Sequence, residues 1–160
     1  MEPTENTAEN PSIFSVFDVA AFILSELGST TTMKLQKLVY YCQAWSLVWD
    51  DRRLFNEEIQ AWANGPVCPA LYNAHRGQFE ISGLSKGNPD NLDETAKETI
   101  NSVLKYYGYK STQWLRDLTH MEEPWMNARG CTRPGDICKT PINLADMAEY
   151  YSSLSKDEDS

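Results

Sequence analysis

Apolar residues return every three or four positions along most of this chain, the spacing that places side chains on one face of an α-helix. The clearest run spans residues 33–49, and its apolar positions are Leu35, Leu38, Val39, Cys42, Trp45 and Trp49. Runs of the same period predict further helices after Ser15, over residues 94–107, from Ser111 or Thr112, and over residues 144–154.

Polar residues at the starts of these runs support the same boundaries. Ser15 precedes the first helix and Asp18 follows three residues later, which is the pattern of a capping box. Asp93 and Asn143 can cap two later helices in the same way. A further short helical turn is expected from Pro124, since proline is common in the first turn of a helix.

Two short segments favour strands instead. Residues 58–63 alternate apolar and polar side chains, and residues 79–81 can form a second small strand. Between them, Asn64, Gly65 and Pro66 predict a turn, and Pro66 is expected to open a helix. Strands this short cannot organise a core. The predicted fold is therefore mainly α: a compact single-domain helical bundle of about six to seven helices with a minor short β element.

Length and charge bound the organisation of the chain. Its 160 residues are enough for one domain with a hydrophobic core. We expect a disordered acidic N-terminal arm at residues 1–12, a folded domain at residues 13–154 and a disordered acidic tail at residues 155–160. The net charge is −9, and no cluster of lysine and arginine offers a footprint for phosphates. These features argue against direct nucleic-acid binding and favour a basic protein partner.

The cysteines and histidines do not suggest a metal site. Cys42, Cys68, Cys131 and Cys138 form no CxxC pair, and the chain has only two histidines. We interpret the cysteines as buried free thiols and expect neither a metal nor a cofactor. No signal peptide opens the chain, and no apolar run approaches the ~20 residues that cross a bilayer. The sequence therefore predicts a cytoplasmic protein that does not engage a membrane.

Three segments carry a family resemblance. Residues 34–45 are close to a KLQKLLYYAQGW pattern, residues 54–72 are similar to LF…EIEAWxxGPVxPxLY, and residues 118–125 are similar to LTHxExPW. Their order and spacing both fit. Over about residues 14–154, the chain resembles the Panacea antitoxin domain family, also described as SocA-like or phage-associated GepA-type antitoxins.

The resemblance implies a function in a bacterial or phage toxin–antitoxin system. Members of the family neutralise a cognate protein toxin, encoded next to them, by direct protein–protein binding. Two alternatives stay open: an adaptor that delivers the toxin to a cellular protease, and a small hydrolase that reverses the damage done by the toxin. On the leading interpretation the protein is not an enzyme.

Six motif residues are candidates for contact with the partner: Lys34, Lys37, Tyr41, Trp62, Tyr72 and His120. Lys34, Lys37 and Tyr41 are spaced to share one side of a helix, where they would form a basic and aromatic patch. In the alternative, the lysine stems cover an apolar edge while their ammonium groups stay in water, paired with Glu57 or Glu58.

The other motif residues are expected to be structural: Leu35, Leu38, Tyr40, Gly65, Pro66, Pro69, Leu71, Pro124 and Trp125. Trp62, Gly65, Pro66 and Pro69 predict a rigid strand–turn–helix corner, because proline restricts its own backbone and that of the preceding residue. Such a corner either only supports the fold or offers a preformed surface to a partner.

A catalytic hypothesis would need His75 or His120 beside Cys131, Asp136 or Glu122. Nucleophilic catalysis requires a nucleophile, a base and an orienting group within hydrogen-bond reach. No local signature encodes such a set in this sequence. We therefore expect His120 to bond a backbone carbonyl or a carboxylate and to serve the fold.

Overall fold

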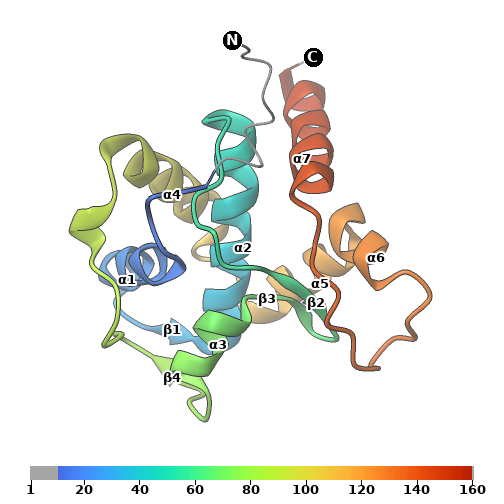
Figure 1. The fold of residues 1–160 in the computed structure, drawn as a ribbon, viewed down its shortest axis with the longest axis horizontal. Coiled ribbons are helices and arrows are strands. Elements are labelled where there is room, and N and C mark those ends of the chain that lie inside the picture. Colours follow the sequence, from blue (N-terminus) through green and yellow to red (C-terminus); the bar gives the residue numbers. More distant parts are fainter. Residues whose placement is uncertain (1–10, 160) are drawn as a thin grey trace.

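Helix α2 (Thr32–Trp49) runs through the middle of the molecule, and the other helices pack around it (Figure 1). A computed structural model describes residues 11–159, with side chains through residue 155. Every residue of α2 from Leu35 to Leu47 is buried, so the helix has no solvent face along most of its length. The apolar stripe predicted from the sequence is present, but Trp49 at its end is 48% exposed.

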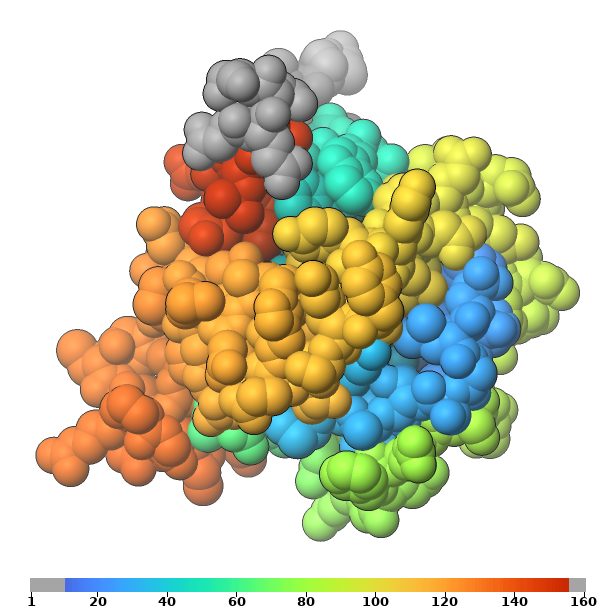
Figure 2. All heavy atoms as spheres, turned by 180° about the vertical axis from the view of Figure 1, so that it is seen from behind, coloured from blue at the N-terminus to red at the C-terminus, as the bar shows by residue number. Residues whose placement is uncertain are grey.

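The described residues form seven α-helices and four very short strands, which confirms the predicted mainly α fold. Besides α2, the elements in chain order are α1 (Val16–Leu27), β1 (Thr30–Thr31), β2 (Gln60–Trp62), β3 (Gly65–Val67), α3 (Pro69–His75), β4 (Glu80–Ile81), the 3-10 turn η2 (Pro89–Asn91), α4 (Glu94–Tyr107), α5 (Thr112–Met121), α6 (Glu123–Arg129) and α7 (Leu144–Asp159). Strand β1 pairs with β4, and β2 pairs with β3, both antiparallel. Seen from behind, residues of α5 cover the middle of the molecule (Figure 2).

The predicted helix caps are present. Both halves of the capping box form at α1, because the Ser15 hydroxyl accepts from the backbone of Asp18 and the Asp18 carboxylate accepts from the Ser15 amide. Asp93 and Ser111 cap α4 and α5 through their side chains. Asn143 accepts a hydrogen bond from the Asp146 amide at the start of α7. Local polar chemistry therefore sets where these helices begin.

Replacing Ser15 by alanine is expected to lower the free energy of unfolding by about 1 kcal/mol, because amide groups of the first turn lose their acceptor. Ser25→Ala on the same helix is the matched control, since the exposed Ser25 hydroxyl only donates to the carbonyl of Phe22. Urea unfolding of the two variants measures the difference. Equal losses in both variants would contradict the cap assignment.

Pro66 does not open a helix, which corrects the sequence prediction. It lies in β3, and α3 begins at Pro69. The cause is a long-range contact: the buried Gln36 side chain on α2 accepts a hydrogen bond from the Cys68 amide at 2.8 Å and donates to the Cys68 carbonyl at 3.4 Å. These bonds keep the chain extended past Pro66 and place Pro69 at the first helical position instead.

A second buried glutamine on α2 holds another connecting segment. Oε1 of Gln43 accepts from the Leu54 amide at 2.6 Å, and its Nε2 donates to the Phe55 carbonyl at 2.9 Å. Gln36 and Gln43 lie about two helical turns apart, so both reach the same side of α2. The glutamines within residues 34–45 thus fix the backbone segments on either side of β2 and β3.

The two chain ends differ from the sequence prediction. Helix α7 continues to Asp159, although a disordered tail was expected from residue 155. No glycine or proline follows Leu154 to stop the helix. At the other end, Ser12 bonds Asn56 and the Leu54 carbonyl, so this part of the expected arm is anchored. Residues 1–10 of that arm lie outside the described residues. Within the described range, none of the helices combines the length and apolarity needed to cross a bilayer.

Candidate functional site

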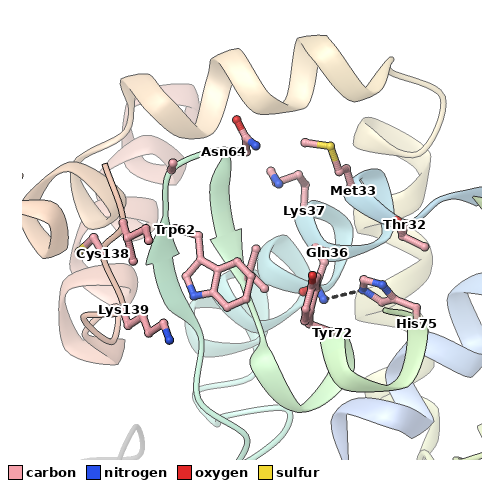
Figure 3. A pocket seen from close by; sticks show the side chains of 13 residues that line it. Thr32, Met33, Gln36, Lys37, Trp62, Asn64, Tyr72, His75, Cys138 and Lys139 are labelled. Carbon is pink, nitrogen blue, oxygen red and sulfur yellow. Dashed lines mark hydrogen bonds between the residues drawn. The ribbon is translucent and has the colours of Figure 1, made fainter. Parts of the chain in front are cut away.

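A pocket with a volume of about 460 Å³ opens where the β2–β3 hairpin, the first turns of α2, α3 and the segment before α7 meet (Figure 3). Its lining residues are Thr32, Met33, Gln36, Lys37, Trp62, Ala63, Asn64, Val67, Tyr72, His75, Ile137, Cys138 and Lys139. A volume of this size is within the range of ligand pockets and can also hold side chains of a protein partner.

Lys37 lies at the base of this pocket and is only 1% exposed. Its side chain extends from α2 beneath Gly65, which has a φ of +123°. A Cβ atom at position 65 would lie 2.5 Å from Cε of Lys37, so a side chain there would displace the lysine. Glycine at this position therefore provides both the backbone conformation and the space that Lys37 occupies.

The environment of Lys37 disfavours its charge. Burial, with a smaller contribution from the nearby Arg116 guanidinium, lowers the pKa of Lys37 from 10.5 to about 8. Among the described residues, no carboxylate forms an ion pair with Lys37 and no acceptor takes a hydrogen bond from its ammonium group. The pocket base is thus a desolvated cation without a partner from its own chain.

Aromatic rings form one wall of the pocket. The rings of Trp62 and Tyr72 meet edge to face with their centroids 5.1 Å apart. Both side chains are half-buried, and the indole of Trp62 donates to Oε1 of Gln60 at 2.8 Å. Because β2 and α3 hold the two rings in place, the wall is preformed.

His75 lines another side of the pocket, where its ring contacts the side-chain amide of Gln36. Nε2 of Gln36 lies 2.9 Å from Nε2 of His75, drawn as a dashed line in Figure 3. The pKa of His75 is lowered, mainly by burial, so the imidazole is neutral at pH 7 and accepts from the amide. The pair links α2 to α3 across the pocket.

The segment at residues 137–139 forms the remaining wall and is held by Arg129 and by backbone bonds between residues 140–142 and residues 59–61. The Arg129 guanidinium is 5% exposed and donates to the carbonyls of Ala61 at 3.0 Å, Arg133 at 2.8 Å and Asp136 at 2.9 Å. It also lies 5.1 Å from the centroid of the Trp125 ring. One buried cation at the end of α6 therefore fixes the irregular segment against β2.

The structure separates the six residues proposed for partner contact. Lys37, Trp62 and Tyr72 line one pocket. Lys34 is partly exposed on α2 and lies outside the pocket lining. The expected patch of Lys34, Lys37 and Tyr41 does not form as one surface, because Tyr41 is fully buried. The alternative, with the Lys37 ammonium in water beside Glu57 or Glu58, is also wrong, since this group is buried without an acidic partner in the described chain.

Tyr41 belongs to a buried network of hydroxyl groups around Glu122. Tyr41 and Tyr151 each donate to Oε1 of Glu122 at 2.7 Å, and the hydroxyls of Tyr40 and Tyr151 lie 3.0 Å apart. Burial raises the pKa of Glu122, while the two tyrosine hydrogen bonds oppose this increase. The network joins α2 and α7 to the junction of α5 and α6. This network accounts for the burial of Tyr40 and Tyr41 in the core, because it gives their hydroxyl groups hydrogen-bond partners.

His120 takes a structural position beside the hairpin. Its ring stacks on Trp125 with centroids 4.0 Å apart and planes inclined by 8°. The Trp125 indole in turn donates to the Trp62 carbonyl at 2.9 Å. Within the described residues, Nε2 of His120 is buried without a hydrogen-bond partner. Burial is the main cause that lowers the pKa of His120, and Arg116 and Lys37 act in the same direction.

The residues of the catalytic hypothesis lie apart. His75 bonds Gln36, His120 stacks on Trp125 and Glu122 bonds two tyrosines, so no hydrogen bond within residues 11–155 joins a histidine to Cys131, Asp136 or Glu122. Over the same residues, no three histidine, cysteine or acidic side chains gather at distances that suit a metal.

The expectation of buried thiols is correct for three of the cysteines and wrong for one. Cys42, Cys68 and Cys138 are buried, whereas Cys131 is exposed in the segment after α6. All four are free thiols. The exposed position of Cys131 follows from its place just beyond Gly130, which ends α6.

Sequence reasoning missed several pocket residues. Met33 precedes Gln36 by three positions and Lys37 by four, a spacing that places it beside both on α2, so this part of the signal was present in the sequence. His75 follows Tyr72 by three positions on α3, which also places both on one side. No local pattern indicates residues 137–139, since long-range contacts bring them to the pocket: Arg129 bonds the Arg133 and Asp136 carbonyls before them, and the Ala61 amide donates to the Thr140 carbonyl after them.

The family model described as "Antitoxin SocA-like, Panacea domain" matches residues 35–126 of this chain. The matched range covers more than half of the sequence and includes the pocket residues Lys37, Trp62 and Tyr72. The pocket wall at residues 137–139 lies outside it. No curated protein and no solved structure matches the chain.

Proposed function

The chain belongs to the antitoxin family with the SocA-like Panacea domain, and from this premise we propose that it neutralises a protein toxin by binding it directly. The toxin is encoded next to the antitoxin, and the two proteins meet in the cytoplasm. Binding covers the working surface of the toxin and requires no chemical step by the antitoxin.

The observation that carries this proposal is the pocket between α2, α3 and the β2–β3 hairpin. Preformed aromatic walls and a desolvated cation are features that bind a partner with little loss of conformational entropy. Tryptophan and tyrosine are also the residue types that most often dominate the energy of protein interfaces. Trp62 and Tyr72 are therefore the expected centre of the contact.

Co-expression with the product of the neighbouring gene tests the proposal. We expect the neighbour to stop growth when expressed alone, and this chain to restore growth and to purify with the neighbour as a stable complex. Trp62→Ala is expected to weaken the complex about tenfold or more, because a half-buried indole leaves the pocket wall. Trp114→Ala is the matched control, since Trp114 lies on α5, is 37% exposed and does not line the pocket.

Different outcomes identify the alternatives. If growth is restored but the toxin disappears only in cells that contain an energy-dependent protease, the adaptor function replaces direct neutralisation. If intact toxin accumulates free of this chain while growth continues, reversal of the damage is the better account. Thermal unfolding of both tryptophan variants shows whether a loss of rescue comes from the pocket or from a loss of fold.

A further inference from the structure

We propose that the pocket receives an acidic side chain of the toxin, whose carboxylate pairs with the ammonium group of Lys37. This inference rests on the proposed function and assigns the chemistry by which the pocket holds its partner. The occupant is an aspartate or glutamate on a protein surface, flanked by apolar residues that contact Met33, Trp62 and Tyr72.

Lys37 has no counter-charge among the described residues of its own chain. Ion pairs join Arg52 to Asp93 and Arg116 to Asp117, whereas no carboxylate of the described residues pairs with Lys37. A buried ammonium group without a hydrogen-bonded partner is strongly unfavourable. Gly65 nevertheless leaves space for this lysine at the base of an open pocket rather than in a closed core. A carboxylate that enters the pocket supplies the partner that the chain itself lacks.

The charge of the pocket lining is opposite in sign to the net charge of the chain. The whole chain carries a net charge of −9, yet no aspartate or glutamate lines the pocket. Its ionisable cationic groups are Lys37 and Lys139, and Arg116 acts on Lys37 from α5. The pocket therefore attracts an acidic side chain of the partner, whereas the net negative charge of the whole chain favours a basic partner surface.

The geometry favours a protein side chain over the phosphates of a nucleic acid. Nucleic-acid binding relies on many cations along an exposed surface, whereas this pocket presents one lysine beneath apolar walls. Figure 3 shows Lys37 beside Met33 and Asn64, with Trp62 and Tyr72 on the neighbouring wall. A carboxylate on a short aliphatic stem can reach the ammonium group while its neighbours cover the rings.

The decisive variant is Lys37→Met, measured in the complex with the product of the neighbouring gene. Methionine keeps most of the volume of the lysine stem and removes the charge. We expect the dissociation constant to rise about ten- to a hundred-fold, as for the loss of a charge-assisted hydrogen bond. Lys105→Met is the matched control: the same change at an exposed lysine on α4, outside the pocket lining, is expected to leave binding within about twofold.

A second pair of variants keeps the test valid if Lys37→Met folds poorly. Met33 lines the pocket one helical turn before Lys37 and is 37% exposed. Met33→Glu places a carboxylate of the chain itself within reach of Lys37, where it competes with the acid of the toxin. We expect Met33→Glu to bind about tenfold or more weakly than Met33→Gln, which has almost the same shape as Met33→Glu and loses the same apolar contact but carries no charge.

The pH dependence gives a signature that a merely structural lysine would not show. The titratable or charged groups around Lys37 are Arg116 and His120 on α5, Tyr72 and His75 on α3, and Cys138 and Lys139 before α7. The free protein loses the Lys37 proton above about pH 8, whereas the complex requires it. Affinity is therefore expected to be steady below pH 8 and to fall about tenfold per pH unit above it.

Cys138 needs a separate control, because a hydrogen bond with Thr140 lowers the pKa of its thiol from 9.0. A pH response that survives in Lys37→Met would belong to Cys138 and would count against the inference.

Binding of Lys37→Met and Met33→Glu at wild-type strength would overturn the inference while the proposed function stands. If the wild-type chain forms no complex, both fall together. A toxin carboxylate whose removal causes no further loss in Lys37→Met would identify the paired residue.

Discussion

Tyr151→Phe is expected to lower the free energy of unfolding by about 2–4 kcal/mol at pH 7. The Tyr151 hydroxyl donates to Glu122, so the proton shared with Tyr40 comes from the Tyr40 side. Removing this hydroxyl takes one donor from a buried carboxylate and leaves the Tyr40 hydroxyl without its acceptor. Tyr40 and Tyr151 are each no more than 1% exposed, so water does not easily replace either bond.

Tyr41→Phe is the matched control for this prediction. Tyr41 makes one hydroxyl bond to Glu122 and is also fully buried, so its loss is expected to be smaller, at about 1.5–3 kcal/mol. Urea unfolding followed by far-ultraviolet circular dichroism measures both variants. A Tyr151→Phe protein as stable as wild type would show that the network adds nothing to stability.

The loss in Tyr151→Phe should also shrink in acid. Glu122 has a raised pKa in the folded protein, so the folded state takes up a proton before the unfolded chain does, and the contribution of Glu122 to stability increases as pH falls through that window. Once Glu122 is neutral, a tyrosine hydroxyl gives it a weaker, uncharged hydrogen bond. Repeating the unfolding experiments at progressively lower pH is therefore expected to bring the variant closer to wild type.

Arg129→Met is expected to destabilise the protein by about 2–4 kcal/mol and to weaken toxin binding as well. The variant leaves three backbone carbonyls without their donor, one of them in β2 and two in the segment after α6. That segment leads to residues 137–139, which line the pocket. Loss of the guanidinium therefore removes both a buried hydrogen-bond set and the support of one pocket wall.

Arg129→Lys separates the charge from the shape of the side chain. Lysine keeps the positive charge but cannot reach three carbonyls with a planar fork. We expect intermediate stability and incomplete restoration of binding. Thermal unfolding and a binding titration with the co-purified toxin measure the two effects. If Arg129→Lys matches wild type in both, charge alone is sufficient and the fork is not required.

Local chemistry made the helices predictable, since the residues that cap them lie next to them in the sequence. Ser15 with Asp18, and Asp93 before α4, are examples where the pattern and the structure agree. Pro66 is the contrary case. Its local preference for a helix start was overruled by Gln36, which holds Cys68 from a distant part of the chain. A rule that uses near neighbours cannot include such a contact.

The candidate site was predictable only in part. Lys37, Trp62 and Tyr72 were identified from the motifs, and the structure brings them to one pocket. Helical spacing also placed Tyr41 beside Lys37, but spacing gives the face of a helix and not what covers it. Because α2 is surrounded, Tyr41 meets Glu122 while Lys37 meets the hairpin. The wall at residues 137–139 depends on the contacts of Arg129 with the Arg133 and Asp136 carbonyls and on backbone pairing with β2, which no periodicity encodes.

The central position of α2 has a consequence for synthesis on the ribosome. Tyr40 and Tyr151 stand 111 positions apart, so the aromatic side of α2 emerges long before the helix that covers it. Until α7 arrives, the surfaces of Tyr40, Tyr41 and Trp45 that contact Tyr151 remain uncovered on a nascent chain. At the usual pace of translation this interval lasts on the order of ten seconds. A toxin made in the same period can act before its antitoxin has completed its fold, so the order in which the two proteins are produced becomes part of the protection.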